Sequence, residues 1–163
     1  MASLELDQLF DALGEDQTET CLQLLADHPN LLAETKIAGR TPLHQAAFCG
    51  NLEVAQYLIS QQVDIDALTD SGWSPLFYAC APMEEDIGLL LIETGCDVAI
   101  SNDDGFTALH LAADMGKSHI AAAILDRGGN INHKDKNGRT PLDTAKDQGW
   151  QPMIDFLVER GAK

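Results

Sequence analysis

Five histidines and four cysteines are the side chains that could ligate a metal or act as nucleophiles. The cysteines, Cys21, Cys49, Cys80 and Cys96, share no C-x-x-C spacing, whereas a zinc site needs about four converging ligands, usually in closely spaced pairs. Cys21, Cys80 and Cys96 stand among Leu, Ala or Gly, where cysteine fills apolar space. No basic residue follows Cys49 closely to lower the pKa of its thiol. We therefore expect four reduced thiols and no metal site.

Three segments resemble ligand loops only superficially. Residues 127–130, Arg-Gly-Gly-Asn, lack the G-x-x-x-x-G-K pattern of a phosphate loop. Residues 103–105 and 132–138 carry Asp, Asn and Gly, but not the spaced carboxylates and terminal Glu of a calcium loop. Turns favour these residue types for backbone reasons. We expect no cofactor and no catalytic constellation, and hence a protein that is not an enzyme.

Composition indicates a globular chain with a strong acidic bias. The 163 residues are 45% hydrophobic and 22% charged, and 26 acidic against 10 basic residues give a net charge of −16. Such a field repels phosphate backbones and anionic membranes, so we expect no direct nucleic-acid or membrane partner. It favours a basic partner, or it serves solubility. No apolar run of membrane-spanning length and no secretory signal is evident, which predicts a cytoplasmic protein.

A repeat of 33 residues organises the chain. Four motifs begin at that constant spacing, and a glycine lies two residues before each of them. The motifs are Thr41-Pro42-Leu43-His44, Ser74-Pro75-Leu76-Phe77, Thr107-Ala108-Leu109-His110 and Thr140-Pro141-Leu142-Asp143. Thr or Ser can cap a helix, and Pro at the next position loses no hydrogen bond because its N–H would be an orphan. Each motif therefore predicts the start of a short helix.

A second, longer helix is predicted in every repeat. Apolar residues recur at i, i+1, i+4 and i+5, which form one face of a helix. They are Val54, Ala55, Leu58 and Ile59; Ile87, Gly88, Leu91 and Ile92; Ile120, Ala121, Ile124 and Leu125; and Met153, Ile154, Leu157 and Val158. Gly50, Gly116 and Gly149 stand where the first helix should end in a left-handed residue. One such helix pair cannot bury its apolar face alone, so neighbouring pairs must stack.

These motifs resemble the ankyrin-repeat family, whose period and T-P-L-H-x-A signature they share. The resemblance implies an all-α solenoid of about five helix-turn-helix repeats joined by hairpin-like turns. We expect a single domain over residues 1–163, with central repeats at 36–68, 69–101 and 102–134 and capping repeats at 1–35 and 135–163. In the first cap, Phe10, Leu13, Cys21, Leu22, Leu25 and Ala26 are the expected core. The resemblance also implies that His44 and His110 bond backbone between neighbouring turns.

Two departures from the family pattern concern local shape. Residues 81–86, which include Pro82, replace the usual glycine-centred turn, so the backbone around Pro82 is expected to differ. Gln62 replaces the usual glycine after the second helix of its repeat. The repeat length is unchanged at both places.

The resemblance implies that partners bind in a concave groove made of the turn tips and the first helices. At those positions the chain offers large apolar side chains, acids around them and a basic residue at each end. The predicted partner-binding residues are Arg40, Phe48, Asp70, Trp73, Asp103, Asp104, Phe106, Asp114, Met115 and Arg139. Alternatively, Trp73 and Phe106 pack against adjacent turns and only stiffen the array.

We therefore expect a protein-interaction module, an adaptor or an inhibitor, that works as a monomer or within a hetero-complex. The alternative is an acidic mimic or immunity-type protein that neutralises a basic nucleic-acid enzyme or toxin by electrostatics. Binding by the mimic should weaken steeply with salt, whereas binding through aromatic anchors should tolerate it.

Overall fold

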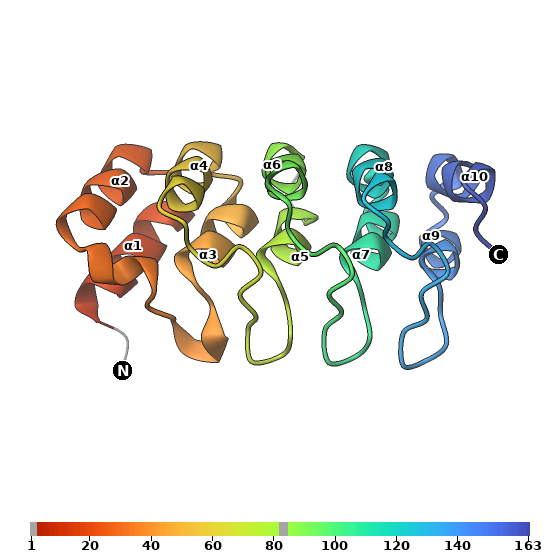
Figure 1. Ribbon diagram of the computed structural model, residues 1–163, viewed down its shortest axis with the longest axis horizontal. Helices are drawn as coiled ribbons and strands as arrows, with labels where there is room; N and C mark the ends of the chain where they lie inside the picture. Colours follow the sequence, from red (N-terminus) through yellow and green to blue (C-terminus); the bar gives the residue numbers. More distant parts are fainter. Residues whose placement is uncertain (1–2, 82–84) are drawn as a thin grey trace.

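The computed structural model describes residues 3–81 and 85–163, and these form pairs of antiparallel helices (Figure 1). The expected irregularity at Pro82 lies outside the described residues. The helices are α1 (Leu4–Gly14), α2 (Thr18–Asp27), α3 (Pro42–Cys49), α4 (Leu52–Ser60), α5 (Pro75–Ala79), α6 (Asp86–Thr94), α7 (Ala108–Asp114), α8 (Ser118–Asp126), α9 (Pro141–Gln148) and α10 (Gln151–Glu159). Two short 3₁₀ helices, η1 (Pro29–Leu32) and η2 (Ile37–Gly39), precede α3.

The helices stand in two rows. Figure 1 places α1, α3, α5, α7 and α9 side by side in one row and α2, α4, α6, α8 and α10 in the other. The loops that lead into α3, α5, α7 and α9 project beyond the first row, and the two termini lie at opposite ends of the array. This arrangement confirms the all-α solenoid expected from the repeat.

The repeated motif starts a helix in the predicted way. The hydroxyls of Thr41, Ser74 and Thr107 each accept a hydrogen bond from the backbone N–H three residues on, at 3.4 Å. Thr140 does the same at 3.2 Å. Gly50 and Gly149 end α3 and α9 in left-handed conformations, with φ of 76° and 71°. The capping and termination signals therefore act as expected.

The core is a stack of leucines and alanines between the rows. Leu43, Leu76, Leu109 and Leu142 are all buried, as are the alanine pairs at 46–47 and 112–113. Two predicted core residues are wrong, since Ala26 is exposed and Val158 keeps 53% of its surface exposed. Within the described residues, the repeats that hold them each contact one neighbouring repeat, so part of each helix face is uncovered in this structure.

The described helices include none long and apolar enough to span a lipid bilayer.

Leu109→Asp should unfold the array, because Leu109 is 1% exposed in the middle of the stack and an unpaired buried charge is costly. We expect a loss of more than about 4 kcal/mol in the free energy of unfolding. Urea denaturation followed by circular dichroism measures it. Val158→Asp is the matched control and should change stability by less than about 0.5 kcal/mol. A Leu109→Asp protein as stable as this control would contradict the packing described.

Candidate protein-binding surface

The projecting loops and the helix ends beside them form one continuous surface. We call it the turn face: the turn tips at residues 37–40, 70–73, 103–106 and 136–139, with the adjoining sides of α3, α5, α7 and α9. The predicted partner-binding residues all belong to these segments or to the residue that follows α7.

Each turn is closed by its own backbone and joined to the next. A backbone N–H donates across the base of every turn, for example from Thr69 to the carbonyl of Trp73 at 3.0 Å. Between turns, Asp70 N–H donates to Ala38 at 2.9 Å. The same bond links Asp103 to Ser71 at 3.1 Å and Lys136 to Asp104 at 2.9 Å. The tips therefore form a ladder with a fixed spacing.

Glycine is required where the turns meet. Gly72 has a φ of 77°, which side chains rarely tolerate, and a Cβ added there would lie 3.1 Å from Cα of Asn102 in the next turn. Gly105 is similar, with a φ of 75° and a 3.2 Å approach to the backbone nitrogen of Lys136. The conserved spacing of these glycines within the chain thus reflects close turn-to-turn contact.

Two buried histidines fasten turns to the preceding helices. The Nδ1 atom of His44 accepts the Thr41 backbone N–H at 3.2 Å, so the proton must sit on Nε2, which donates to the Trp73 carbonyl at 2.9 Å. His110 repeats the arrangement and donates to the Arg139 carbonyl at 3.2 Å. Burial is the main cause that lowers the pKa of both rings below the ordinary value. The structural role implied for both histidines is confirmed.

Phe77 occupies the histidine position of the third repeat and changes the surface there. Its buried ring cannot donate to a carbonyl. It lies 4.0 Å from the Trp73 ring centre and 6.2 Å from that of Phe106, and Phe106 lies 4.7 Å from His110. Trp73 and Phe106 are consequently half-buried. Both rings therefore pack on neighbouring rings of the array, while part of their surface stays exposed.

Phe48 and Met115 are exposed, at 52% and 41%. Phe48 meets Tyr78 with ring centres 6.1 Å apart, and Tyr78 lies 6.0 Å from Trp73. Ring contacts therefore run without a break from Phe48 through Tyr78 and Trp73 to Phe77 and Phe106. We call these five residues the aromatic row.

The predicted acids differ in how free they are. Asp70, Asp103 and Asp104 are exposed, and no ion pair engages them within the described part of the chain. Asp114 is half-buried and already occupied: its carboxylate accepts from Gln148 at 2.8 Å, and its backbone carbonyl accepts from the Trp150 indole at 2.6 Å. Three of the four acids are thus available to a partner.

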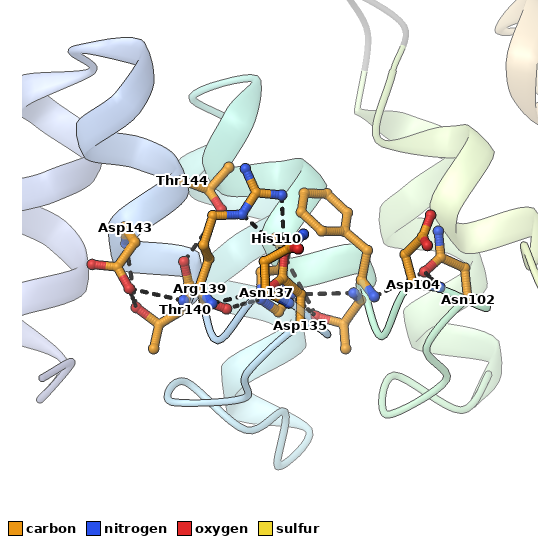
Figure 2. Close-up of polar contacts among 11 residues, drawn as sticks. Asn102, Asp104, His110, Asp135, Asn137, Arg139, Thr140, Asp143 and Thr144 are labelled. Atoms are coloured by element: carbon orange, nitrogen blue, oxygen red, sulfur yellow. Dashed lines mark hydrogen bonds and ion pairs between the residues drawn. The ribbon is translucent and has the colours of Figure 1, made fainter.

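Arg139 is neutralised within its own turn, as Figure 2 shows. Its Nε and Nη2 atoms both lie 2.9 Å from Oδ2 of the buried Asp135. Burial alone would raise the pKa of Asp135, but hydrogen bonds from Arg139 and Asn137 hold it below the usual range. The two predicted basic ends therefore differ, and only Arg40 keeps an uncompensated charge.

A cleft of about 320 Å³ opens between the turn tips at 70–73 and 136–139. Its lining joins aromatic walls to polar groups of the turns, namely Trp73, Asn102, Asp104, Phe106, Asp135, Asn137 and Arg139. Figure 2 shows the polar side of this region, with Asn102 and Asp104 on one turn and Asp135, Asn137 and Arg139 on the next. The cleft could receive a side chain of a partner.

Sequence reasoning missed two contributors to this surface. Phe77 stands where two of the other motifs have histidine, and this difference in the sequence could have indicated that its ring contributes to the surface. Phe10 comes from α1, and its ring lies 5.9 Å from the Arg40 guanidinium. Nothing in the repeat spacing indicates that contact, because the first repeat lacks the motif.

Three of the four cysteines are buried, and the pKa of the thiol is raised in all four. Cys21, Cys80 and Cys96 are buried, and burial raises the pKa of their thiols to about 11, 12 and 12. Cys49 is exposed, yet partial burial raises its pKa despite the nearby Arg40. Across residues 3–81 and 85–163, no three His, Cys, Asp or Glu side chains gather as metal ligands would.

Comparison with known proteins identifies the family. A family model described as ankyrin repeats (3 copies) matches residues 9–102 and 84–163. The chain therefore belongs to the ankyrin-repeat family, a class of arrays that serve as protein-interaction modules.

Two relatives each match about half of the chain. A mouse protein, ankyrin repeat and protein kinase domain-containing protein 1, is 36% identical over 87 residues, which are 52% of this chain and 12% of that protein. Human protein phosphatase 1 regulatory subunit 27 is 39% identical over 82 residues, 50% of this chain and 53% of that subunit. The chain thus spans about half the length of the regulatory subunit and a small part of the kinase-domain protein.

The buried histidines predict a pH-dependent stability. Because the pKa of His110 is lower in the folded than in the unfolded chain, its contribution is complete above about pH 6.5 and declines as the pH falls toward the folded-state pKa. His110→Phe places at this motif position the residue that Phe77 provides in its own repeat. The variant therefore lacks the pH-dependent contribution of His110 to the free energy of unfolding. The stability difference between wild type and variant, from urea denaturation, should shrink between pH 7.5 and pH 5. A difference that stays constant over this range would contradict the assignment.

Proposed function

We propose that this chain is a non-catalytic protein that binds a partner protein on the turn face and acts as an adaptor or an inhibitor. The observation that carries the proposal is the aromatic row, in which five rings make continuous contact across the second, third and fourth repeats. Phe48 remains 52% exposed at its end. Aromatic anchors of this kind dominate the energy of many protein interfaces.

Preorganisation supports the proposal. The rings of Trp73 and Phe106 are half-buried and hold each other through Phe77, so a partner would not have to immobilise them. Binding then loses less side-chain entropy than it would with freely rotating anchors. The hydrogen-bonded ladder of turns holds the spacing between anchors in the same way.

The free acids favour a basic segment of the partner. Asp70, Asp103 and Asp104 stand on the turn tips beside Trp73 and Phe106, and the net charge of the chain is −16. A lysine or arginine of the partner could stack on a ring and pair with a carboxylate. Long-range attraction would also speed association.

The similarity to human protein phosphatase 1 regulatory subunit 27 suggests a regulatory role toward such a phosphatase. The matched stretch is about half of each chain, so we propose the phosphatase only as the first partner to test. Four free cysteines suit a reducing compartment, and we propose the cytoplasm.

Replacing Trp73 and Phe106 together with alanine should reduce partner binding by at least about tenfold. The lost ring contacts should also lower stability by about 1–3 kcal/mol, so binding is measured well below the melting temperature. The assay is affinity capture from nuclease-treated lysate at low and high salt, with direct titration of the protein phosphatase 1 catalytic subunit.

Phe156→Ala is the control, because Phe156 is half-buried in α10 of the other helix row. Retention of the partner by this variant and its loss from the double variant, at both salts, support the proposal. Capture of a basic protein at low salt only, indifferent to the double variant, would instead support the acidic mimic.

A further inference from the structure

Arg40 is a cation without a carboxylate. The chain has 10 basic and 26 acidic residues, and ion pairs engage Lys36 with Asp7 at 3.1 Å and Arg139 with Asp135 at 2.9 Å. Arg160 pairs with Asp126 as well. No described acidic side chain lies in ion-pair range of Arg40. In a chain with such an excess of acid, an unpaired arginine on the turn face calls for an explanation.

Aromatic rings and one amide hold the guanidinium in place. Its central carbon lies 5.3 Å from the ring centre of Tyr78, 5.7 Å from that of Phe48 and 5.9 Å from that of Phe10. Nη2 donates to the side-chain oxygen of Gln45. The Nε atom is buried and meets no acceptor. Arginine pressed against rings keeps donors at its edge, so remaining N–H groups can still bind an oxyanion.

The surroundings of Arg40 suit an apolar group next to that oxyanion. Phe48 is 52% exposed, and Tyr78 also borders a hollow of about 200 Å³ that is lined by Ala38, Thr69, Ser71 and Trp73 as well. A carboxylate at the guanidinium edge and an apolar side chain against Phe48 or in the hollow would occupy neighbouring positions.

We propose that Arg40, Phe48 and Tyr78 form a subsite for an Asp or Glu side chain of the partner protein, flanked in that partner by an aromatic or aliphatic residue. This inference rests on the proposed function, and it adds the direction in which the partner segment would lie along the turn face. The acidic residue of the partner segment lies at the turn tip 37–40, and its basic residue lies near Asp103 and Asp104 at the tip 103–106.

The negative field of the protein does not prevent this contact. At physiological ionic strength charges are screened over about 8 Å, whereas the arginine–carboxylate contact is direct and charge-assisted. The ring faces also exclude water from one side of the guanidinium, which strengthens the attraction at its free edge.

Two capped dipeptides test the subsite: N-acetyl-Phe-Glu-amide and its neutral isostere N-acetyl-Phe-Gln-amide. Titrations are followed by ¹H–¹⁵N NMR of the backbone and of the Arg40 side chain. We expect the Glu peptide to bind at least about fivefold more tightly, with shifts centred on Arg40, Phe48 and Tyr78. Equal affinities, or shifts centred elsewhere, would overturn the proposal.

Arg40→Gln should abolish the preference for the Glu peptide, whereas Arg127→Gln should keep it. Arg127 is an exposed residue at the end of α8, so the control makes the same change in net charge away from the subsite. A preference that persists in Arg40→Gln would exclude Arg40 as its source. A third peptide, N-acetyl-Phe-Gln with a free terminal carboxylate, tests the source of the carboxylate. If it binds more tightly than the Glu peptide, the subsite recognises a C-terminal carboxylate, and the proposal of an Asp or Glu side chain is refuted.

The two proposals can fail separately. Partner capture that is lost in the Trp73/Phe106 double variant but unchanged in Arg40→Gln would leave the turn face as the binding surface and remove the carboxylate subsite. Peptide discrimination that depends on Arg40, with partner capture indifferent to the double variant, would retain the subsite and reject the aromatic row as the principal anchor.

Discussion

Hydrogen bonding from one repeat to the next turn is the interaction on which the rest of the structure depends. Each helix pair is too small to bury its own apolar face, so the array holds together only through neighbours. Burial of leucines and alanines supplies the free energy of that contact, but hydrophobic burial does not fix the orientation of one repeat relative to the next. The hydrogen bonds from His44 to the Trp73 carbonyl and from His110 to the Arg139 carbonyl are directional and fix that orientation. They fix the turns at 70–73 and 136–139 at a defined place relative to the preceding helices, and with them the side chains of those two turns.

The two motifs without histidine show where this constraint can be relaxed. Asp143 follows the turn at 136–139, and it caps its own helix by accepting hydrogen bonds from the Thr140 backbone N–H and hydroxyl. Phe77 stands inside the array, and there the backbone ladder between Ser71 and Asp103 already joins the turns. Its ring is therefore free to pack between Trp73 and Phe106. The loss of one directional bond is what creates the centre of the aromatic row.

Much of the fold could be predicted because it depends on local spacing. The motif positions of Thr41 and Pro42, the glycines and the apolar pairs each specify a cap, a turn or a buried face within a few residues. The exposure of Trp73 and Phe106 could not, since it depends on how their rings orient against Phe77 and His110, the residues four positions on. The environment of Arg40 combines Phe10, Phe48 and Tyr78 from three repeats. Spacing within one repeat contains no information on such contacts.

Charge pairing then distinguishes two residues that look equivalent in the repeat. Arg40 and Arg139 occupy the same motif column, yet the residue four positions earlier is Lys36 in one turn and Asp135 in the other. Asp135 accepts from its own turn and neutralises Arg139, whereas Lys36 turns to Asp7 and offers Arg40 nothing. Over the tips at 37–40, 70–73 and 103–106, the free charges therefore run from the Arg40 cation to the carboxylates of Asp70, Asp103 and Asp104. A linear segment bound along such a row would have one favoured direction, which a uniformly acidic surface could not impose.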